Sequence, residues 1–384
     1  MPVPPIPVMA VYGTRPEAIK LAPVIRALRA EPSFACQVVV TGQHPEMVGR
    51  VNQLFGIAPD AAIDIYTRKS DPGGAVAKTL QRLAPELERL RPQALLVQGD
   101  TSSALGAGLA AFFAGIPAVH VEAGLRTGDL AAPFPEEGNR RLLSQICSLH
   151  LAPTARNKAN LLAEGVKAAA VAVTGNTVID ALLAVAGSDG QAADGAVRQA
   201  LASGRRLVLV TAHRRESWGE PMRRIAAAVR ELAQTHPEVG FVLPLHPNPL
   251  VRQALEPALS PLANVYLTEP LDYLDLVRLV QAATAVLTDS GGLQEEAPSL
   301  GVPVLVLRET TERPEGVAAG NARLVGTDPA QIAAQTARLL GDPAAHAAMA
   351  QARNPYGDGR AAERTCAALA EFFGVGRRLA DFAG

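Results

Sequence analysis

The sequence predicts an α/β protein built from parallel sheets covered by helices and divided into two halves of similar size. The main observation is that short runs of β-branched residues alternate with longer segments of Ala, Leu and Arg at helical spacing. Such alternation is typical of parallel sheets with helices on both faces. The length of 384 residues indicates two domains, at about 150 residues for each. A hydrophobic fraction of 48% with 19% charged residues is ordinary for a globular protein with a large core.

Strands are predicted where apolar, β-branched runs are bounded by turn residues. The first series comprises Val8–Tyr12, Gln37–Thr41, Ala94–Gln98, Ala118–Val121 and Ser148–Ala152. The second series comprises Val171–Thr174, Leu207–Thr211, Phe241–Leu245, Asn264–Leu267, Ala285–Thr288 and Val302–Leu307. Helical segments such as Ala75–Leu90 and Met222–Gln234 lie between the strands, so each strand is expected to be followed by a helix.

The alternation pauses once, in the segment Ala186–Gly204, which is rich in Gly, Ala, Ser and Asp. Two helical segments follow one another there without an intervening strand. We therefore place residues 1–176 in the first domain and residues 177–360 in the second. A capping pattern, Thr177 with Asp180, marks the start of the helix at this boundary. The last helix, Ala361–Phe373, has no strand after it, so residues 361–384 are expected to cross back and join the first domain.

The charge balance excludes several classes of partner. Thirty-six Lys and Arg against 37 Asp and Glu give a net charge of −1, which provides no bulk field for nucleic acid or an anionic membrane. Three scattered cysteines, Cys36, Cys147 and Cys366, argue against a disulfide framework and fit a reducing compartment. The longest uncharged run, Thr101–Val119, contains glycines and a proline and is typical of a buried helix followed by a strand. No secretory signal pattern is seen, so we expect a cytoplasmic protein.

Residues that follow the predicted strands are candidate site residues, because ligands of parallel α/β sheets bind beyond the carboxyl ends of the strands. After the first strand, Arg15 stands at a helix N-terminus and Lys20 lies further along that helix. A cation at this end of a helix is unfavourable unless an anion binds there. The alternative interpretation is a solvated arginine and a lysine that extends to water.

Two carboxylates, Asp100 and Glu122, follow two further strands. Carboxylates at neighbouring strand ends can act as general acid and base once burial raises their pKa values. Asp100 could equally cap the helix that begins near Ser102, whereas Glu122 has no such capping role. Glu136 opens another helix, where an ordinary i,i+4 pair with Arg140 is the simpler interpretation.

In the second half, His213 and His246 lie in successive loops that follow strands. A histidine in such a loop is well placed to bind phosphate or carry a proton, although a lone one is more often a hydrogen-bonded loop residue. Two of them in successive loops favour the functional interpretation. No group of His, Cys and carboxylate residues has metal-ligand spacing, so no metal site is expected.

The sharpest single feature is a strand that runs into Ser290-Gly291-Gly292 and then into a helix. Backbone N–H groups and the helix dipole at such a turn bind phosphate, and glycine lets the anion approach the backbone. Glu296, further along the helix, could accept hydrogen bonds from ribose hydroxyls. The alternative is a turn loosened by glycine. Arg313 precedes a proline that starts a helix, as Arg15 does.

Two familiar nucleotide motifs do not apply. Gly106-Ala107-Gly108 fits the dinucleotide fingerprint but lies inside a predicted helix, where its glycines cannot form the phosphate turn. The sequence of a P-loop does not occur. We therefore expect no nicotinamide and no other cofactor.

Several blocks of sequence together resemble the non-hydrolysing UDP-N-acetylglucosamine 2-epimerases. In chain order they are GTRPEAIK, QGDT, HVEAGLRTGD, PFPEEGNR, TGNTVID, TAHRRE, LTDSGGLQEEAPSLG and RETTERPEGV. The resemblance implies two Rossmann-like domains with parallel sheets flanking a deep cleft, the GT-B-like architecture. It also implies reversible epimerisation at C2 of UDP-GlcNAc to UDP-ManNAc, by elimination of UDP to 2-acetamidoglucal and re-addition, without a redox cofactor.

The resemblance assigns roles to individual residues. The positions that hold the diphosphate are Arg15, Ser290, Gly291 and Gly292, with Arg313 and the candidate catalytic His213 nearby. Glu296 matches the acid that binds ribose, and His246 another site histidine. The carboxylates of the acid–base chemistry are Asp100, Glu122 and Glu136, with the cations Lys20 and Arg140 beside them.

Bacterial members of that family bind a second UDP-GlcNAc as an activator, in a pocket that includes Gln43 and Glu136. A further glutamine of that pocket is replaced here by Glu46, and a carboxylate so close to a nucleotide sugar disfavours allosteric activation. The resemblance implies UDP-GlcNAc, UDP-ManNAc and UDP as ligands and a homodimer as the assembly. No nucleic acid or membrane partner is expected.

Three alternatives remain open at this point. A GT-B UDP-sugar glycosyltransferase would need an acceptor groove, often with an apolar or basic surface, and the sequence indicates neither. A sensor that only binds nucleotide sugars would need the phosphate site but not three carboxylates. A closer alternative is a 2-epimerase of a related UDP-2,3-diacetamido uronic acid sugar.

Overall fold

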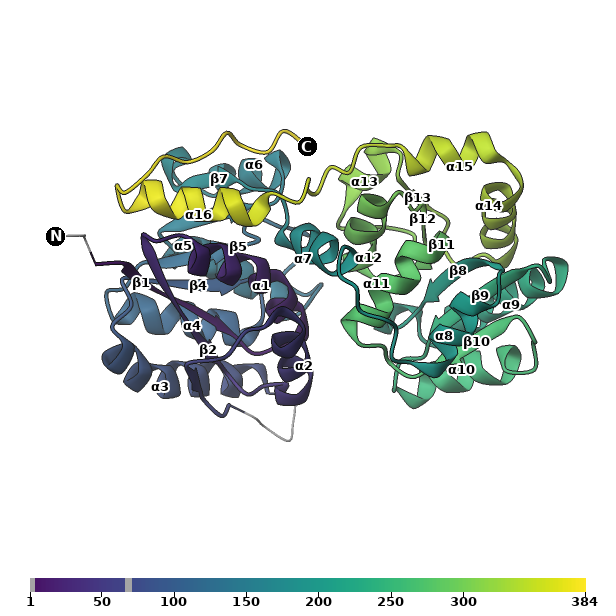
Figure 1. The fold of residues 1–384 in the computed structure, drawn as a ribbon, viewed down its shortest axis with the longest axis horizontal. Coiled ribbons are helices and arrows are strands. Elements are labelled where there is room, and N and C mark those ends of the chain that lie inside the picture. Colours follow the sequence, from purple (N-terminus) through teal and green to yellow (C-terminus); the bar gives the residue numbers. More distant parts are fainter. Residues whose placement is uncertain (1–3, 66–70) are drawn as a thin grey trace. The chain divides into compact units, whose positions relative to one another are not determined.

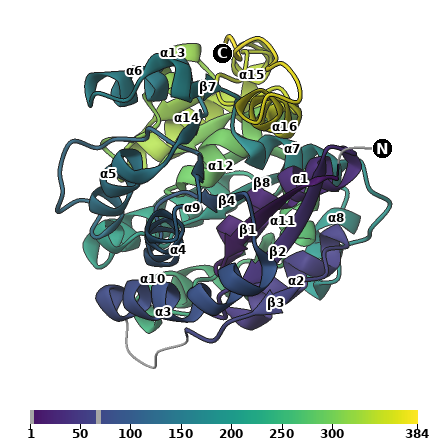
Figure 2. The same ribbon diagram turned by 90° about the vertical axis from the view of Figure 1, so that its left-hand side faces the viewer.

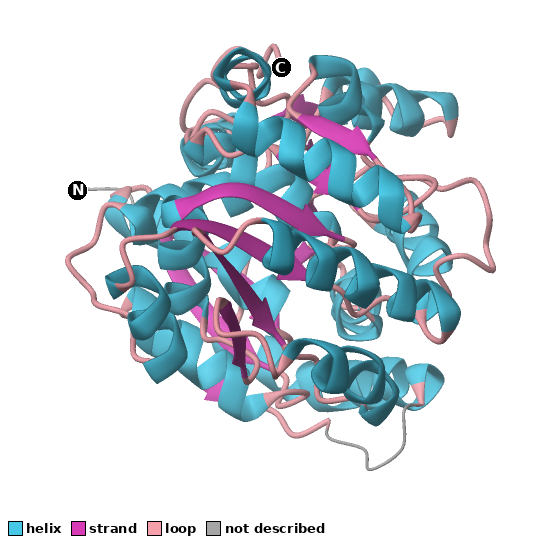
Figure 3. Cartoon of the chain, turned by 90° about the vertical axis from the view of Figure 1, so that its right-hand side faces the viewer, coloured by secondary structure: helices cyan, strands magenta, loops and turns pink. Residues whose placement is uncertain are grey.

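The computed structural model describes residues 4–65 and 71–384, and its chain forms two compact units (Figure 1). Unit 1 contains Met1–Ala181 and Tyr356–Gly384, and unit 2 contains Leu182–Pro355. Each described unit is built on one parallel sheet with helices packed against it. In Figure 3 the strands, in magenta, lie between helices, in cyan. The predicted fold class, α/β with two Rossmann-like domains, is confirmed.

Unit 1 contains a sheet with the order β3-β2-β1-β4-β5-β6-β7 among its described residues. The strands are β1 Ile6–Tyr12, β2 Phe34–Val40, β3 Ala61–Ala62, β4 Ala94–Gln98, β5 Ala118–Val121, β6 Leu149–Ala152 and β7 Val171–Val173. β1 pairs with β2 along its whole length, and β4, β5 and β6 follow as neighbours. Because the sheet is covered on both faces, its central strands are mostly apolar, and Ala94–Gln98 is buried at every position.

Several helices of unit 1 begin at recognisable caps. They are α1 Arg15–Ala30, α2 Pro45–Phe55, α3 Pro72–Leu90, α4 Ser102–Phe113, α5 Glu136–Ile146, α6 Ala155–Ala163 and α16 Ala361–Phe372, with a short 3₁₀ helix at Ala168–Ala170. Thr14 and Glu17 form a capping box at α1, and Asp71 accepts a hydrogen bond from Gly74 N at α3. α2 ends at Gly56, whose φ of 66° suits glycine.

The glycines of the rejected dinucleotide fingerprint lie inside α4, as predicted. A Cβ on Gly106 would lie 2.7 Å from Thr79 Cβ and 2.8 Å from Val76 O on α3. A Cβ on Gly108 would lie 2.6 Å from Leu143 Cδ2 on α5. These glycines therefore permit close packing of α4 against its two neighbouring helices rather than binding of a phosphate.

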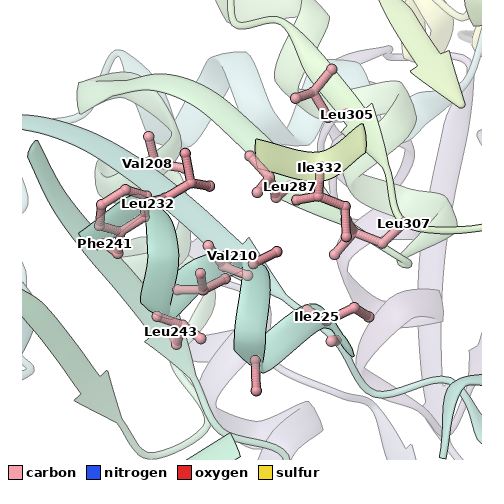
Figure 4. Close-up of a cluster of buried hydrophobic side chains, with 14 of the residues drawn as sticks. Val208, Val210, Ile225, Leu232, Phe241, Leu243, Leu287, Leu305, Leu307 and Ile332 are labelled. Carbon is pink, nitrogen blue, oxygen red and sulfur yellow. The ribbon is translucent and has the colours of Figure 1, made fainter. Parts of the chain in front are cut away.

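Unit 2 contains a sheet with the order β10-β9-β8-β11-β12-β13 among its described residues. The strands are β8 Arg206–Thr211, β9 Val239–Pro244, β10 Val265–Thr268, β11 Ala283–Thr288, β12 Val304–Val306 and β13 Ala322–Leu324. The helices are α8 Gly195–Ala202, α9 Glu220–Thr235, α10 Pro249–Leu259, α11 Tyr273–Ala282, α12 Gly291–Glu296, α13 Pro314–Ala319, α14 Pro329–Gly341 and α15 Pro343–Ala350, with 3₁₀ helices at Arg215–Ser217 and Ala297–Leu300. Figure 4 shows the apolar cluster between sheet and helices, which includes Phe241, Leu287, Ile225 and Ile332.

The chain passes between the units at α7 (Thr177–Ala186) and returns at Tyr356. The helix was predicted to be capped by Thr177 with Asp180, and this prediction is wrong. Asn176 caps α7, because its Oδ1 accepts a hydrogen bond from Val178 N at 3.1 Å. The Asp180 carboxylate instead accepts from Ala361 N and Ala362 N, the first N–H groups of α16. α16 then packs against α1 of unit 1 (Figure 2).

The predicted strands are all present, and their ends match the predicted ones or differ by at most three residues. Two strands were missed, β3 and β13, because runs of two and three residues are too short to show a period. Within the described residues, no helix is both long and apolar enough to cross a membrane.

Candidate active site

The carboxyl ends of three adjacent strands are followed by three of the predicted residues of unit 1. β1, β4 and β5 are neighbours in the sheet, and they lead into Arg15, Asp100 and Glu122 respectively. Lys20 lies on α1, which follows β1. The strand order therefore brings together residues that are more than 100 positions apart in the chain, as Lys20 and Glu122 are.

The Glu122 carboxylate receives hydrogen bonds from three elements. Lys20 Nζ lies 2.5 and 2.7 Å from its two oxygens, and Asn176 Nδ2 lies 2.9 Å from Oε1. Gln98 Nε2 donates to Oε2. Glu122 also has a φ of 65°, a left-handed conformation that is uncommon for a residue with a side chain. Breaking such a largely buried ion pair leaves an uncompensated charge, at a cost of about 3–5 kcal/mol.

Asp100 belongs to a second charged group, with Arg140 and Glu137. Arg140 Nη2 pairs with Asp100 Oδ2, and its Nη1 lies 3.2 Å from Glu137 Oε2. Thr101, not Asp100, caps α4, because its Oγ1 accepts from Ala104 N at 3.0 Å. The capping interpretation of Asp100 is thus wrong.

The expected i,i+4 partnership of Glu136 with Arg140 is also wrong. Glu137, which sequence reasoning did not select as a site residue, is fully buried and accepts from Arg140, Arg141 and the backbone of Thr127. Burial alone would raise the pKa of Glu137, but these hydrogen bonds and charges outweigh burial and lower the pKa. Glu136 remains partly exposed at the start of α5.

Glu136 lines a cavity of about 460 Å³ within unit 1. Asp100, Thr14, Gln43 and Asn139 line the same cavity. Gln43 Oε1 accepts a hydrogen bond from Ser103 Oγ at 3.0 Å. Glu46 lies outside the set of lining residues, on the exposed face of α2. The structure thus brings Gln43 and Glu136 to the same cavity as Asp100, whereas Glu46 is not among the residues that line it.

In unit 2, His213 is paired with a buried aspartate that sequence reasoning missed. His213 Nδ1 lies 3.0 Å from Asp289 Oδ1, and Asp289 Oδ2 accepts from the backbone N–H groups of His213 and Arg214, each at 2.8 Å. Burial alone would raise the pKa of Asp289, but these contacts outweigh it and lower the pKa. The signal was present in the sequence, because Asp289 directly follows a strand and precedes Ser290.

His246 stacks on His213, with ring centroids 6.0 Å apart and an interplanar angle of 19°. Burial lowers the pKa of His246, and the neighbouring His213 lowers it further. The two predicted histidines therefore lie side by side in unit 2, where strands β8 and β9 end.

Gly291 and Gly292 start α12 after Ser290, and Gly291 makes room for Arg313. A Cβ on Gly291 would lie 2.4 Å from Arg313 Nη1. The Arg313 guanidinium contacts Glu295 and Glu312, the latter at 2.7 Å. Burial alone would raise the pKa of Glu312, but Arg313, Arg214 and Arg308 outweigh it and lower the pKa to about 2. This loop thus concentrates arginines beside the glycine-containing turn at which α12 begins, an arrangement suited to a phosphate.

The predicted ribose acid, Glu296, has a partner that sequence reasoning missed. Tyr273 OH donates to Glu296 Oε1 at 2.9 Å, and both side chains are buried. Burial raises the pKa of Tyr273, and the adjacent carboxylate raises it further. Tyr273 therefore stays protonated and fixes the position of Glu296 on α12.

The arrangement suits two kinds of chemistry. Unit 1 presents the carboxylates Asp100 and Glu122, each next to a cation, which suits proton transfer. Unit 2 presents histidines, arginines and a glycine-containing turn, which suits a phosphorylated ligand. Among the residues that the structure describes, no group of three or more His, Cys, Asp or Glu residues could hold a metal ion.

Comparisons with known proteins identify close relatives. The family described as UDP-N-acetylglucosamine 2-epimerase matches residues 26–370. The UDP-N-acetylglucosamine 2-epimerase of Escherichia coli K12 is 46% identical over 94% of this chain and 98% of its own. That of Yersinia pestis is 47% identical over 94% of this chain and 98% of its own. The crystal structure of UDP-GlcNAc 2-epimerase from Neisseria meningitidis, bound to UDP-GlcNAc, has a TM-score of 0.88 at 43% identity, covering 95% of this chain and all of the other.

Proposed function

The chain belongs to the UDP-N-acetylglucosamine 2-epimerase family, and from this premise we propose that it interconverts UDP-GlcNAc and UDP-ManNAc by elimination and re-addition of UDP. Its membership makes it an epimerase, an isomerase. The observation that supports the mechanism best is the pair of carboxylates, Asp100 and Glu122, which follow the adjacent strands β4 and β5 and each contact a cation.

The elimination removes the proton from C2 while the bond between C1 and the UDP oxygen breaks. The C2 proton passes to a carboxylate of unit 1, and the electron pair of the broken bond leaves with UDP. The product of this step is 2-acetamidoglucal. Return of a proton to the opposite face of C2, with re-addition of UDP at C1, completes the epimerisation. General acid–base groups contribute about 10²–10⁴-fold each to such proton transfers.

The leaving UDP gains negative charge as the bond breaks, so it requires groups that bind this charge more strongly in the transition state. We assign that role to Arg15, Arg313 and the backbone N–H groups of Ser290–Gly292. Glu296, which Tyr273 holds in place, is proposed to accept hydrogen bonds from the ribose hydroxyls. The proton transfers at C2 are assigned to the carboxylates Asp100, Glu122 and Glu136 of unit 1.

The function is tested by incubating the purified protein with UDP-GlcNAc in D₂O, without added nucleotide cofactor, and following the sugar by NMR. Elimination exchanges the C2 hydrogen with a group that equilibrates with solvent, so UDP-ManNAc should carry deuterium at C2. Asp100→Asn, Glu122→Gln and Glu136→Gln should each lower kcat by about 10²–10⁴-fold. A product that keeps its original C2 hydrogen after many turnovers would contradict the elimination.

The same experiment separates the alternatives. Turnover of a UDP-2,3-diacetamido uronic acid sugar, but not of UDP-GlcNAc, would show that the substrate is the related sugar. Consumption of the donor only when an acceptor is added would show a glycosyltransferase instead.

A further inference from the structure

One donor to the Glu122 carboxylate comes from the loop between β7 and α7. Lys20 lies on α1 and Gln98 ends β4, both beside Glu122 in the sheet order. Asn176 instead lies 54 residues further along the chain, where its Nδ2 donates to Glu122 Oε1 at 2.9 Å. It is 2% exposed, so the contact is buried.

Asn176 is held in place by the two segments through which the chain leaves and re-enters unit 1. Its backbone N donates to Tyr356 O at 2.6 Å, and its Oδ1 accepts from Val178 N, in the first turn of α7. Tyr356 is the residue at which the chain returns to unit 1. A single asparagine therefore uses its backbone and both atoms of its side-chain amide to join Glu122 to both segments.

Two glycines let these segments pack closely at Asn176. Gly175 has a φ of 84°, and a Cβ there would lie 3.4 Å from Gly357 Cα. A Cβ on Gly357 would lie 2.9 Å from Ile179 and 3.3 Å from Asn176 O. Asp180, one helical turn beyond Asn176, accepts hydrogen bonds from the start of α16. Asn176 is thus held in a tightly packed junction of the two segments, which hydrogen bonds also join.

We propose that Asn176 is a positioning residue for Glu122, which ties the carboxylate to the junction of the two segments. The inference rests on the proposed function, in which Glu122 takes part in proton transfer at C2. Glu122 occupies a left-handed backbone conformation, which a residue with a side chain keeps only where its surroundings hold it. A neutral amide fixes the carboxylate without adding a second cation beside Lys20.

The test compares Asn176→Asp and Asn176→Ser with the parent. Aspartate keeps the acceptor for Val178 N but places a carboxylate where the donor to Glu122 was. Serine keeps a hydroxyl that can cap α7 but is too short to reach Glu122. Because a small misplacement of a catalytic group can cost about 10²-fold, we expect kcat to fall about 10²-fold in Asn176→Asp and about 10-fold in Asn176→Ser, with KM little changed.

Asp180→Asn is the matched control, since it alters the same junction but does not touch Glu122. It should leave kcat near that of the parent even if the melting temperature changes. Calorimetric titration with UDP should give the same Kd for all four proteins, because none of the substitutions changes a residue proposed to contact UDP.

The outcomes are distinct. Asn176 variants that are folded and have the parent's kcat would overturn the inference while leaving the proposed function intact. The inference would also be overturned if Asp180→Asn lost as much kcat as the Asn176 variants. The same holds if both Asn176 variants lost kcat only because they lost folded structure. In either case Asn176 would have a structural role alone. A parent without epimerase activity would contradict the proposed function itself.

Discussion

At the scale of single residues, the pairing of His213 with Asp289 is the contact that most changes the chemistry expected of the site. Nδ1 of His213 faces the buried carboxylate at 3.0 Å, so its other ring nitrogen is the one presented to a ligand. Asp289 is itself held by two backbone N–H groups, which fixes the direction of the ring. We therefore expect His213 and Asp289 to act together, so that loss of either one removes the function of both.

This expectation is tested by a double-mutant cycle. Asp289→Asn and His213→Asn should each lower kcat/KM for epimerisation by about 10²-fold. Each substitution removes one member of the His213–Asp289 pair, which carries a proton or binds charge. The double variant should be no worse than His213→Asn alone, since residues that act as a unit are strongly non-additive. Independent, multiplying losses would contradict the pairing. Circular dichroism of each variant controls for unfolding.

At the scale of elements, the strands β5 and β6 bury two histidines against each other. His120 and His150 are paired in register, and their rings meet edge to face with centroids 6.4 Å apart. His120 Nε2 lies 2.7 Å from the carbonyl oxygen of Gly99, next to Asp100. Burial lowers the pKa of each histidine from 6.5 to about 4, and the His120 ring further lowers that of His150.

These strands should therefore make the protein sensitive to mild acid. Below pH 6.5 the unfolded chain binds protons at both positions while the folded chain does not. Stability should therefore fall by about 1.4 kcal/mol per pH unit for each histidine as the pH drops from 6.5 towards 4. His150→Phe should remove about half of that slope in urea denaturation. Between pH 7 and 8 the stability of parent and variant should run parallel, and an unchanged slope below pH 6.5 would contradict the prediction.

At the scale of the whole molecule, exposed aromatic side chains suggest where copies of the chain meet. Phe112 and Phe113, at the end of α4, are 52% and 72% exposed, and Leu142 on the adjacent α5 is 56% exposed. Exposed apolar side chains on neighbouring helices of this kind mark association surfaces. The family resemblance implies a homodimer. We propose that its two copies contact each other through this surface.

Phe113→Glu should then convert the dimer to a monomer, because it places a charge in an apolar contact. Light scattering coupled to size exclusion measures the mass directly. Leu250→Glu is the matched control: it changes a side chain that is 53% exposed on α10 of unit 2, and it should leave the dimer intact. A monomeric parent, or the same mass for parent and Phe113→Glu, would contradict the assignment.

Local sequence patterns were sufficient to predict the fold class, nearly all strands, and the loops that hold Arg15, Asp100, Glu122, His213 and Ser290. This succeeded because strand–helix alternation and strand-end position are properties of neighbouring residues. β3 and β13 escaped because they are too short to have a period.

What only the tertiary structure decided is which of these residues contact one another. Arg140 meets Asp100, 40 positions away, rather than Glu136 on its own helix. Asp180 caps a helix 181 positions further along the chain, and Asn176 reaches back to Glu122. Such contacts depend on how loops and side chains are placed once the sheet has formed. A periodic pattern carries no information about them, because the partners come together only through the packing of distant segments.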